Sequence, residues 1–83
     1  MEIKHEKDRQ RFVCYRDGYE SVLEYRLLAE RGIDFTRTFV PEPLRGQGIA
    51  EKLVRSGIAW AREQEFTMQA SCWYVKRFLR GAH

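Results

Sequence analysis

Apolar and polar positions alternate along the first half of the chain, which is the pattern of half-buried strands. Residues 3–5 and 10–15 are short candidates, and the Asp17-Gly18 pair that follows them tolerates positive φ and so favours a hairpin turn. Residues 21–28 and 33–40 alternate more clearly. The apolar side chains of each stretch fall on one face, at Leu23, Tyr25 and Leu27 and then at Ile33, Phe35 and Phe39. Four strands joined by short turns predict an antiparallel meander.

The pattern changes at Pro41 and Pro43, because proline cannot continue a central strand. Beyond Gly48, apolar residues recur at helical spacing and predict a helix over residues 48–64, at Ile49, Leu53, Val54, Gly57, Ile58 and Ala61. Residues 66–71 predict a short strand, and residues 73–80 a second helix with Tyr74 and Phe78 facing inward. A strand, a helix and a strand in succession form a crossover, so the last strand is expected to lie parallel to the fourth. The predicted class is α+β, in one domain over residues 1–83.

The composition limits the choice of partners. A chain of 83 residues suffices for one compact domain, and 43% apolar residues is typical of globular proteins. The net charge of +3 is spread along the chain, so it suits an anionic small molecule, a weakly bound nucleic acid or simply a solvated surface. The aromatic residues do not alternate with lysine or arginine as they do in a nucleic-acid-binding sheet. We therefore expect no nucleic-acid partner.

The N-terminal residues are charged and unlike a signal peptide, and no apolar run approaches the ~20 residues that span a bilayer. The expected location is therefore cytoplasmic, with no membrane partner and with Cys14 and Cys72 reduced. His, Cys and acidic residues do not occur at metal-ligand spacing, so no metal is expected. His5 and His83 lie near the ends of the chain and are expected to be solvated. Packing roles are expected for Cys14, Trp60 and Trp73.

The loop between the fourth predicted strand and the first predicted helix carries the strongest chemical signal. Gly46 and Gly48 let a ligand approach the backbone closely, and the helix that follows offers unpaired N–H groups. Arg45 adds a charge-assisted contact, and Ala50 keeps the first helical turn small. These features favour a pyrophosphate site, although two glycines before a helix also occur at ordinary turns. A P-loop is excluded because no Gly-Lys-Ser/Thr follows, and a dinucleotide fingerprint because the third glycine is absent.

The same loop resembles that of a known family. It matches the R-x-x-G-x-[G/A] acetyl-CoA loop of the GNAT superfamily of N-acetyltransferases, through Arg45, Gly46, Gln47, Gly48, Ile49 and Ala50. Residues 36–41 resemble the strand that precedes this loop. Residues 72–79 resemble the C-terminal segment of the very small, YjdJ-like members, in which Cys-Pro-Phe-Val is often followed by a short aromatic helix. The resemblance covers the whole chain and implies a minimal GNAT-like acetyl-CoA-binding domain.

An acetyltransferase acting on an unidentified amine is the function that this resemblance implies. The backbone of Val40 would pair with the pantetheine arm of acetyl-CoA, and the amides of residues 46–50 would hold the pyrophosphate. Cys72 would lie near the acetyl thioester, as a nucleophile or as a group lining the site. An inert buried thiol is the alternative for Cys72, because free cysteine is commonly buried.

Three positions depart from the family's pattern. Arg37 stands where many relatives have histidine, Phe39 where they have an acidic residue, and Trp73 where they have proline. The first two remove candidate proton-transfer groups. A non-catalytic module that binds CoA or acyl-CoA is therefore the alternative function. A monomer is expected, or a weak homodimer that pairs through an exposed sheet edge.

Overall fold

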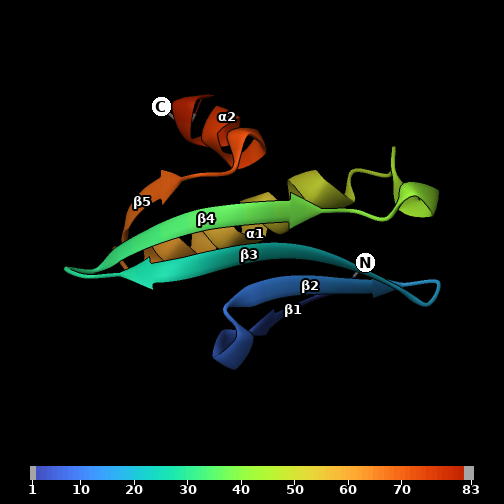
Figure 1. The fold of residues 1–83 in the computed structure, drawn as a ribbon, viewed down its shortest axis with the longest axis horizontal. Helices are drawn as coiled ribbons and strands as arrows, with labels where there is room; N and C mark the ends of the chain where they lie inside the picture. Colours follow the sequence, from blue (N-terminus) through green and yellow to red (C-terminus); the bar gives the residue numbers. More distant parts are fainter. Residues whose placement is uncertain (1, 82–83) are drawn as a thin grey trace.

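A five-stranded sheet forms the centre of the computed structural model, which describes residues 2–81 (Figure 1). The strands are β1 (Ile3–Glu6), β2 (Arg11–Arg16), β3 (Tyr19–Leu28), β4 (Gly32–Phe39) and β5 (Thr67–Ala70). The helices are α1 (Ile49–Glu63) and α2 (Trp73–Gly81), with 3₁₀ turns at Lys7–Arg9 and Glu42–Leu44. Strands β1 to β4 pair antiparallel in sequence order, and β5 pairs parallel with β4. The predicted α+β order of meander, helix, strand and helix is confirmed.

The core lies between the sheet and α1, which crosses behind the strands in Figure 1. The apolar stripe of α1 is buried against side chains from β2, β3 and β4, among them Phe12, Leu23, Tyr25, Ile33 and Phe35. Cys14 is fully buried in this core, which confirms its packing role. Gly57 lets the helix approach the sheet closely, because a Cβ there would lie 2.6 Å from Cδ2 of Leu23.

Strand β4 carries a β-bulge. Tyr25 pairs with Phe35, and the residue before Tyr25 pairs with Arg37, so Thr36 has no partner on β3. The extra residue reverses the alternation of side chains beyond it. Phe39 therefore lies on the face away from α1 and is 40% exposed. The prediction that Phe39 shares a face with Phe35 is wrong for this reason.

One further expectation is wrong. Leu27 lies on the same face of β3 as Tyr25, as predicted, and is 48% exposed near the end of the strand. His5, however, is half-buried, since its ring stacks on Phe12 with 4.0 Å between centroids and meets the edge of Trp60 at 4.4 Å. Its Nε2 also lies 2.6 Å from the hydroxyl of Tyr25. Burial, with the charge of a nearby lysine, lowers the pKa of His5. His83 lies outside the described residues.

Candidate functional site

Strands β4 and β5 separate halfway along β4. Their pairing ends where Phe35 lies opposite Ala70, and the N–H groups of Ser71 and Cys72 then both donate to the carbonyl of Phe35, at 3.0 and 3.1 Å. The chain turns into α2 there, while β4 continues to Phe39 with no strand beside it on that edge among residues 2–81. An open strand edge can accept an extended ligand through main-chain hydrogen bonds.

The carboxylate of Asp34 fixes the chain at the point where β5 ends and separates from β4. Asp34 accepts hydrogen bonds from the backbone N–H of Ser71 at 2.7 Å and from its hydroxyl at 2.6 Å. These contacts fix the residue that precedes Cys72, and Cys72 in turn stands immediately before α2. The carbonyl of Cys72 accepts from the N–H of Lys76 at 3.0 Å, as expected for a residue at a helix N-terminus.

The environment of Cys72 favours its thiolate. Its Sγ lies 3.6 Å from Oγ1 of Thr38, which the bulge turns toward this side of β4. Burial raises the pKa of Cys72, but hydrogen bonds from the backbone N–H groups of Val75 and Tyr74 and from Thr38 outweigh it, so that the pKa lies below that of an ordinary thiol. The thiolate is the nucleophilic form of cysteine.

An open hollow of about 430 Å³ lies beside this thiol, and we call it the Cys72 hollow. It is lined by Thr38, Phe39, Val40, Arg45, Ala50, Cys72, Trp73 and Tyr74. Trp73 stands at its rim and is 68% exposed, so its packing is limited to the edge of the site.

Both glycines of the loop before α1 have left-handed backbone conformations. Gly46 has φ of 86° and Gly48 has φ of 77°, in the left-handed region that favours glycine. A Cβ at either position would meet no atom within 4 Å, so the space in front of both is open. Gly48 lies immediately before α1, and a left-handed residue followed by helical ones points successive N–H groups into one concavity.

These N–H groups are available to an anion. The N–H of Arg45 donates to the carbonyl of Glu42, and the next backbone N–H with a backbone acceptor is that of Lys52, which donates to the carbonyl of Gly48 at 3.2 Å. In the described chain, the N–H groups of residues 46–51 therefore have no backbone acceptor. A second hollow of about 210 Å³, which we call the loop hollow, lies against this segment. It is lined by Val40, Leu44, Arg45, Gly46, Gly48, Ile49, Ala50, Glu51 and Tyr74.

The side chain of Arg45 forms a hydrogen bond within the loop. Its Nε donates to the carbonyl of Val40 at 3.0 Å. The sequence predicted that Arg45 and Val40 each contact the cofactor, whereas here they contact one another. A ligand that bonds to this carbonyl must share it with Arg45 or displace the guanidinium.

The hollows connect most of the residues predicted for the site. Val40, Arg45 and Ala50 line both hollows, so the loop hollow and the Cys72 hollow lie next to one another. Gln47 is exposed and lines neither hollow.

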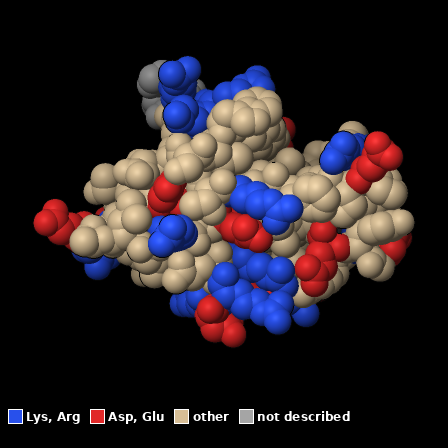
Figure 2. All heavy atoms as spheres, viewed as in Figure 1, with Lys and Arg blue, Asp and Glu red and all other residues tan. Residues whose placement is uncertain are grey.

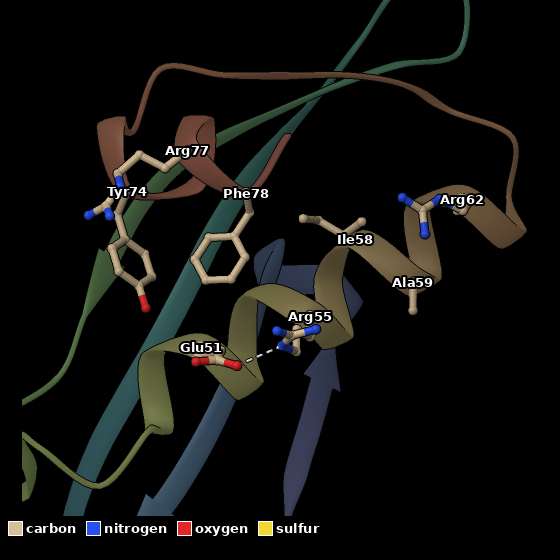
Figure 3. A pocket seen from close by; sticks show the side chains of 8 residues that line it. All are labelled: Glu51, Arg55, Ile58, Ala59, Arg62, Tyr74, Arg77 and Phe78. Atoms are coloured by element: carbon tan, nitrogen blue, oxygen red, sulfur yellow. Dashed lines mark hydrogen bonds and ion pairs between the residues drawn. The ribbon is translucent and has the colours of Figure 1, made fainter. Parts of the chain in front are cut away.

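Sequence reasoning missed Thr38 and assigned Tyr74 only to packing. Tyr74 lines both hollows and also a groove of about 630 Å³ between α1 and α2 (Figure 3). Burial and the carboxylate of Glu51 raise the pKa of Tyr74, and Arg77 partly offsets them, so its hydroxyl remains a donor at neutral pH.

Charge around the site is uneven. In Figure 2, Lys and Arg side chains gather over α2 at the top of the view, where few acidic atoms are drawn. They come from Lys76, Arg77 and Arg80 in a helix without an acidic residue.

Among residues 2–81, His, Cys, Asp and Glu form no group of three or more that could hold a metal ion. No helix of the described chain is long and apolar enough to cross a membrane.

Comparison with known proteins gives consistent results. A family model described as GCN5-related N-acetyl-transferase matches residues 11–83. Protein NATD1 of Bos taurus is 28% identical over 82 residues, which are 96% of this chain and 73% of that protein. Protein NATD1 of Homo sapiens is 27% identical over the same shares of the two chains. The NMR structure of a GCN5-like protein from Staphylococcus aureus superposes with a TM-score of 0.75 at 29% identity, over 96% of this chain and 78% of the other.

Proposed function

This chain belongs to the GCN5-related N-acetyltransferase family, and we propose that it binds acetyl-CoA across the loop hollow and the Cys72 hollow and transfers the acetyl group to an amine. The loop is the observation that carries the proposal. It combines two left-handed glycines, open space in front of both, and backbone N–H groups without backbone partners at the start of α1. A helix N-terminus of this form suits a pyrophosphate.

The order of the hollows suits the parts of this ligand. The pyrophosphate would bind the amides of residues 46–50, and the pantetheine arm would lie along the open edge of β4 beside Val40. The thioester would then lie toward Cys72. The hydroxyl of Tyr74 would donate a hydrogen bond to the ligand, since this side chain lines both hollows.

The transfer requires few groups from the protein. The amine nitrogen attacks the thioester carbonyl, the carbon–sulfur bond breaks, CoA leaves as a thiol, and the amine loses a proton. Cys72 can serve as the base, or its thiolate can accept the acetyl group first and pass it to the amine. Its lowered pKa increases the fraction of thiolate, which is the form that both roles need.

A module that binds CoA without turnover is the second candidate. The observation that favours it is the lining of the Cys72 hollow, which in the described chain contains no carboxylate and no imidazole. An acetyltransferase built this way depends on Cys72 or on solvent for proton removal, whereas a binding module needs neither.

Binding is tested by calorimetric titration of acetyl-CoA, with Gly48→Ala and Gly18→Ala as matched variants. Both glycines have positive φ, 77° and 81°, and open space around the Cβ position, so both changes introduce a similar strain of about 1–2 kcal/mol. Only Gly48 lies at the proposed site. We expect Gly48→Ala to weaken binding about tenfold or more, and Gly18→Ala to leave it unchanged. Equal affinities of the two variants would exclude the loop as the binding site.

Turnover is tested by chromatographic measurement of CoA released from acetyl-CoA in the presence of a panel of amines. Release by the wild type that is lost in Cys72→Ala, while acetyl-CoA affinity is kept, supports the enzyme and its thiol. Binding without release across the panel supports the module instead.

A further inference from the structure

The far end of the Cys72 hollow is formed by residues that take no part in the loop hollow. Thr38, Phe39, Cys72 and Trp73 line the first of these hollows and not the second. The far end opens on the other face of the sheet, because Phe39 lies on the face away from α1, whereas Ala50 belongs to α1 itself. A thioester that enters from the loop passes Cys72 and directs its acyl group toward Phe39 and Trp73.

The size of this hollow exceeds what an acetyl group needs. Its volume of about 430 Å³ lies within the range of sites that hold ligands of drug size. An acetyl group adds a single methyl group beyond the thioester carbonyl. Bound acetyl-CoA would therefore leave the aromatic surface at the far end in contact with water.

Two large aromatic side chains are exposed at the far end. Trp73 is 68% exposed and Phe39 is 40% exposed. The guanidinium of Arg37 lies 5.1 Å from the centre of the Phe39 ring, and that of Arg77 lies 5.8 Å from the Trp73 ring. Exposed aromatic surface around a hollow is typical of a site that receives an apolar group, because covering it removes apolar surface from water.

The charge of the lining distinguishes an acyl group from a protonated amine as the occupant of the far end. In the described chain the lining contains Arg45 and no acidic side chain. An ammonium group would lose part of its hydration there without gaining a counter-charge. An apolar acyl group has no such loss, and it gains contact with Phe39 and Trp73.

We infer that the far end of the Cys72 hollow binds the acyl part of the thioester, and that the preferred acyl group is apolar, larger than acetyl, and lies against Phe39 and Trp73. The inference rests on the proposed function, because the loop must hold CoA for the acyl group to reach this end. It adds the class of the acyl donor. The donor range extends from acetyl-CoA to larger aliphatic and aromatic acyl-CoA thioesters, which bind more tightly.

The test measures the binding of ketone analogues of acetyl-, butyryl-, benzoyl- and succinyl-CoA by calorimetry. In these analogues a methylene group separates the sulfur from the carbonyl, so no acyl group can transfer to Cys72. We expect the benzoyl analogue to bind the wild type about tenfold more tightly than the acetyl analogue, and the butyryl analogue about threefold more tightly, because the added apolar group is partly buried. The succinyl analogue should bind no more tightly than the acetyl analogue.

The variants are Trp73→Ala and Phe39→Ala, with Tyr19→Ala as the matched control. Tyr19 is exposed to nearly the same extent as Phe39, 42% against 40%, and it lines neither hollow. Trp73→Ala and Phe39→Ala should each reduce the preference for the benzoyl analogue to about threefold or less. Their affinity for the acetyl analogue should stay within about twofold of the wild type, which also shows that they are folded. Tyr19→Ala should keep the whole preference.

The outcomes separate this inference from the function on which it rests. Equal binding of the acetyl, butyryl and benzoyl analogues to the wild type overturns the inference and leaves the CoA site standing. A preference that survives in both Trp73→Ala and Phe39→Ala overturns it too, as does a succinyl analogue that binds most tightly. Failure of all four analogues to bind overturns the inference together with the proposed function. A preference for the benzoyl analogue that is lost in either variant and kept in Tyr19→Ala supports the inference.

Discussion

Gly57 sets the distance between α1 and the sheet, and with it the position of the loop amides at the start of α1. A Cβ at this position would lie 2.6 Å from Cδ2 of Leu23 and 3.1 Å from Cε1 of Phe35, and both of these side chains are fully buried. Gly57→Ala gains about 1 kcal/mol from helix propensity and loses about 1–3 kcal/mol from overpacking. Because 2.6 Å is closer than Cβ contacts in folded proteins, overpacking should dominate. We expect the free energy of unfolding to fall by up to about 2 kcal/mol.

The assay is urea unfolding followed by circular dichroism, in the wild type and in a Leu23→Val background. Valine is shorter than leucine, so it removes Cδ2 of residue 23, the nearer of the two atoms that Gly57→Ala would meet, at a cost of about 1 kcal/mol by itself. In that background Gly57→Ala should become neutral or stabilising, with a coupling between the two sites of about 1 kcal/mol or more. A stabilising effect of Gly57→Ala in the wild type, or the same effect in both backgrounds, would refute the reasoning.

Four further predictions concern the site. Alkylation of Cys72 by iodoacetamide should have a midpoint below the pH of about 8.5 of a free thiol, and Thr38→Val should raise it; a midpoint at or above that of a free thiol would contradict the lowered pKa. Since the folded state favours the thiolate, the free energy of unfolding should rise with pH from the folded pKa to the ordinary one, and Cys72→Ser should remove that rise. Asp34→Ala removes both hydrogen bonds that hold the start of α2 and should cost about 1–2 kcal/mol in urea unfolding, so an unchanged midpoint would show that this clamp is not stabilising. Glu51→Gln should tighten acetyl-CoA binding about two- to fivefold in calorimetry, because it removes a carboxylate beside the anion site, and the same change at Glu63, at the other end of α1, should have no effect.

The parts of the fold that local patterns determine were predicted closely. The apolar stripe placed a helix at residues 48–64, and α1 occupies Ile49–Glu63. The hairpin turn was predicted because few residues tolerate positive φ, and Asp17 and Gly18 have φ of 52° and 81°. In each case the residues of one short segment determine its conformation.

The burial of His5 could not be predicted from such local patterns. Nothing next to it in the sequence predicts burial, and its partners Phe12, Tyr25 and Trp60 come from three other elements. They meet only because β1 pairs with β2 at the edge of the sheet and α1 crosses the same face. Tyr74 is a similar case, because the pattern of α2 predicts that it faces inward but does not show that it meets the loop.

The bulge in β4 decides which side chains face the thiol. It arises from how β4 pairs with β3, so the alternation along β4 alone cannot reveal it. Beyond Thr36, Thr38 turns toward Cys72, while Arg37 pairs with Glu24 at 3.5 Å on the face away from α1. The guanidinium of Arg37 also lies 5.1 Å from the ring of Phe39 on that face. The described lining of the Cys72 hollow contains no carboxylate and no imidazole. If acetyl transfer occurs in this hollow, the proton of the amine therefore goes to the thiolate of Cys72 or to solvent.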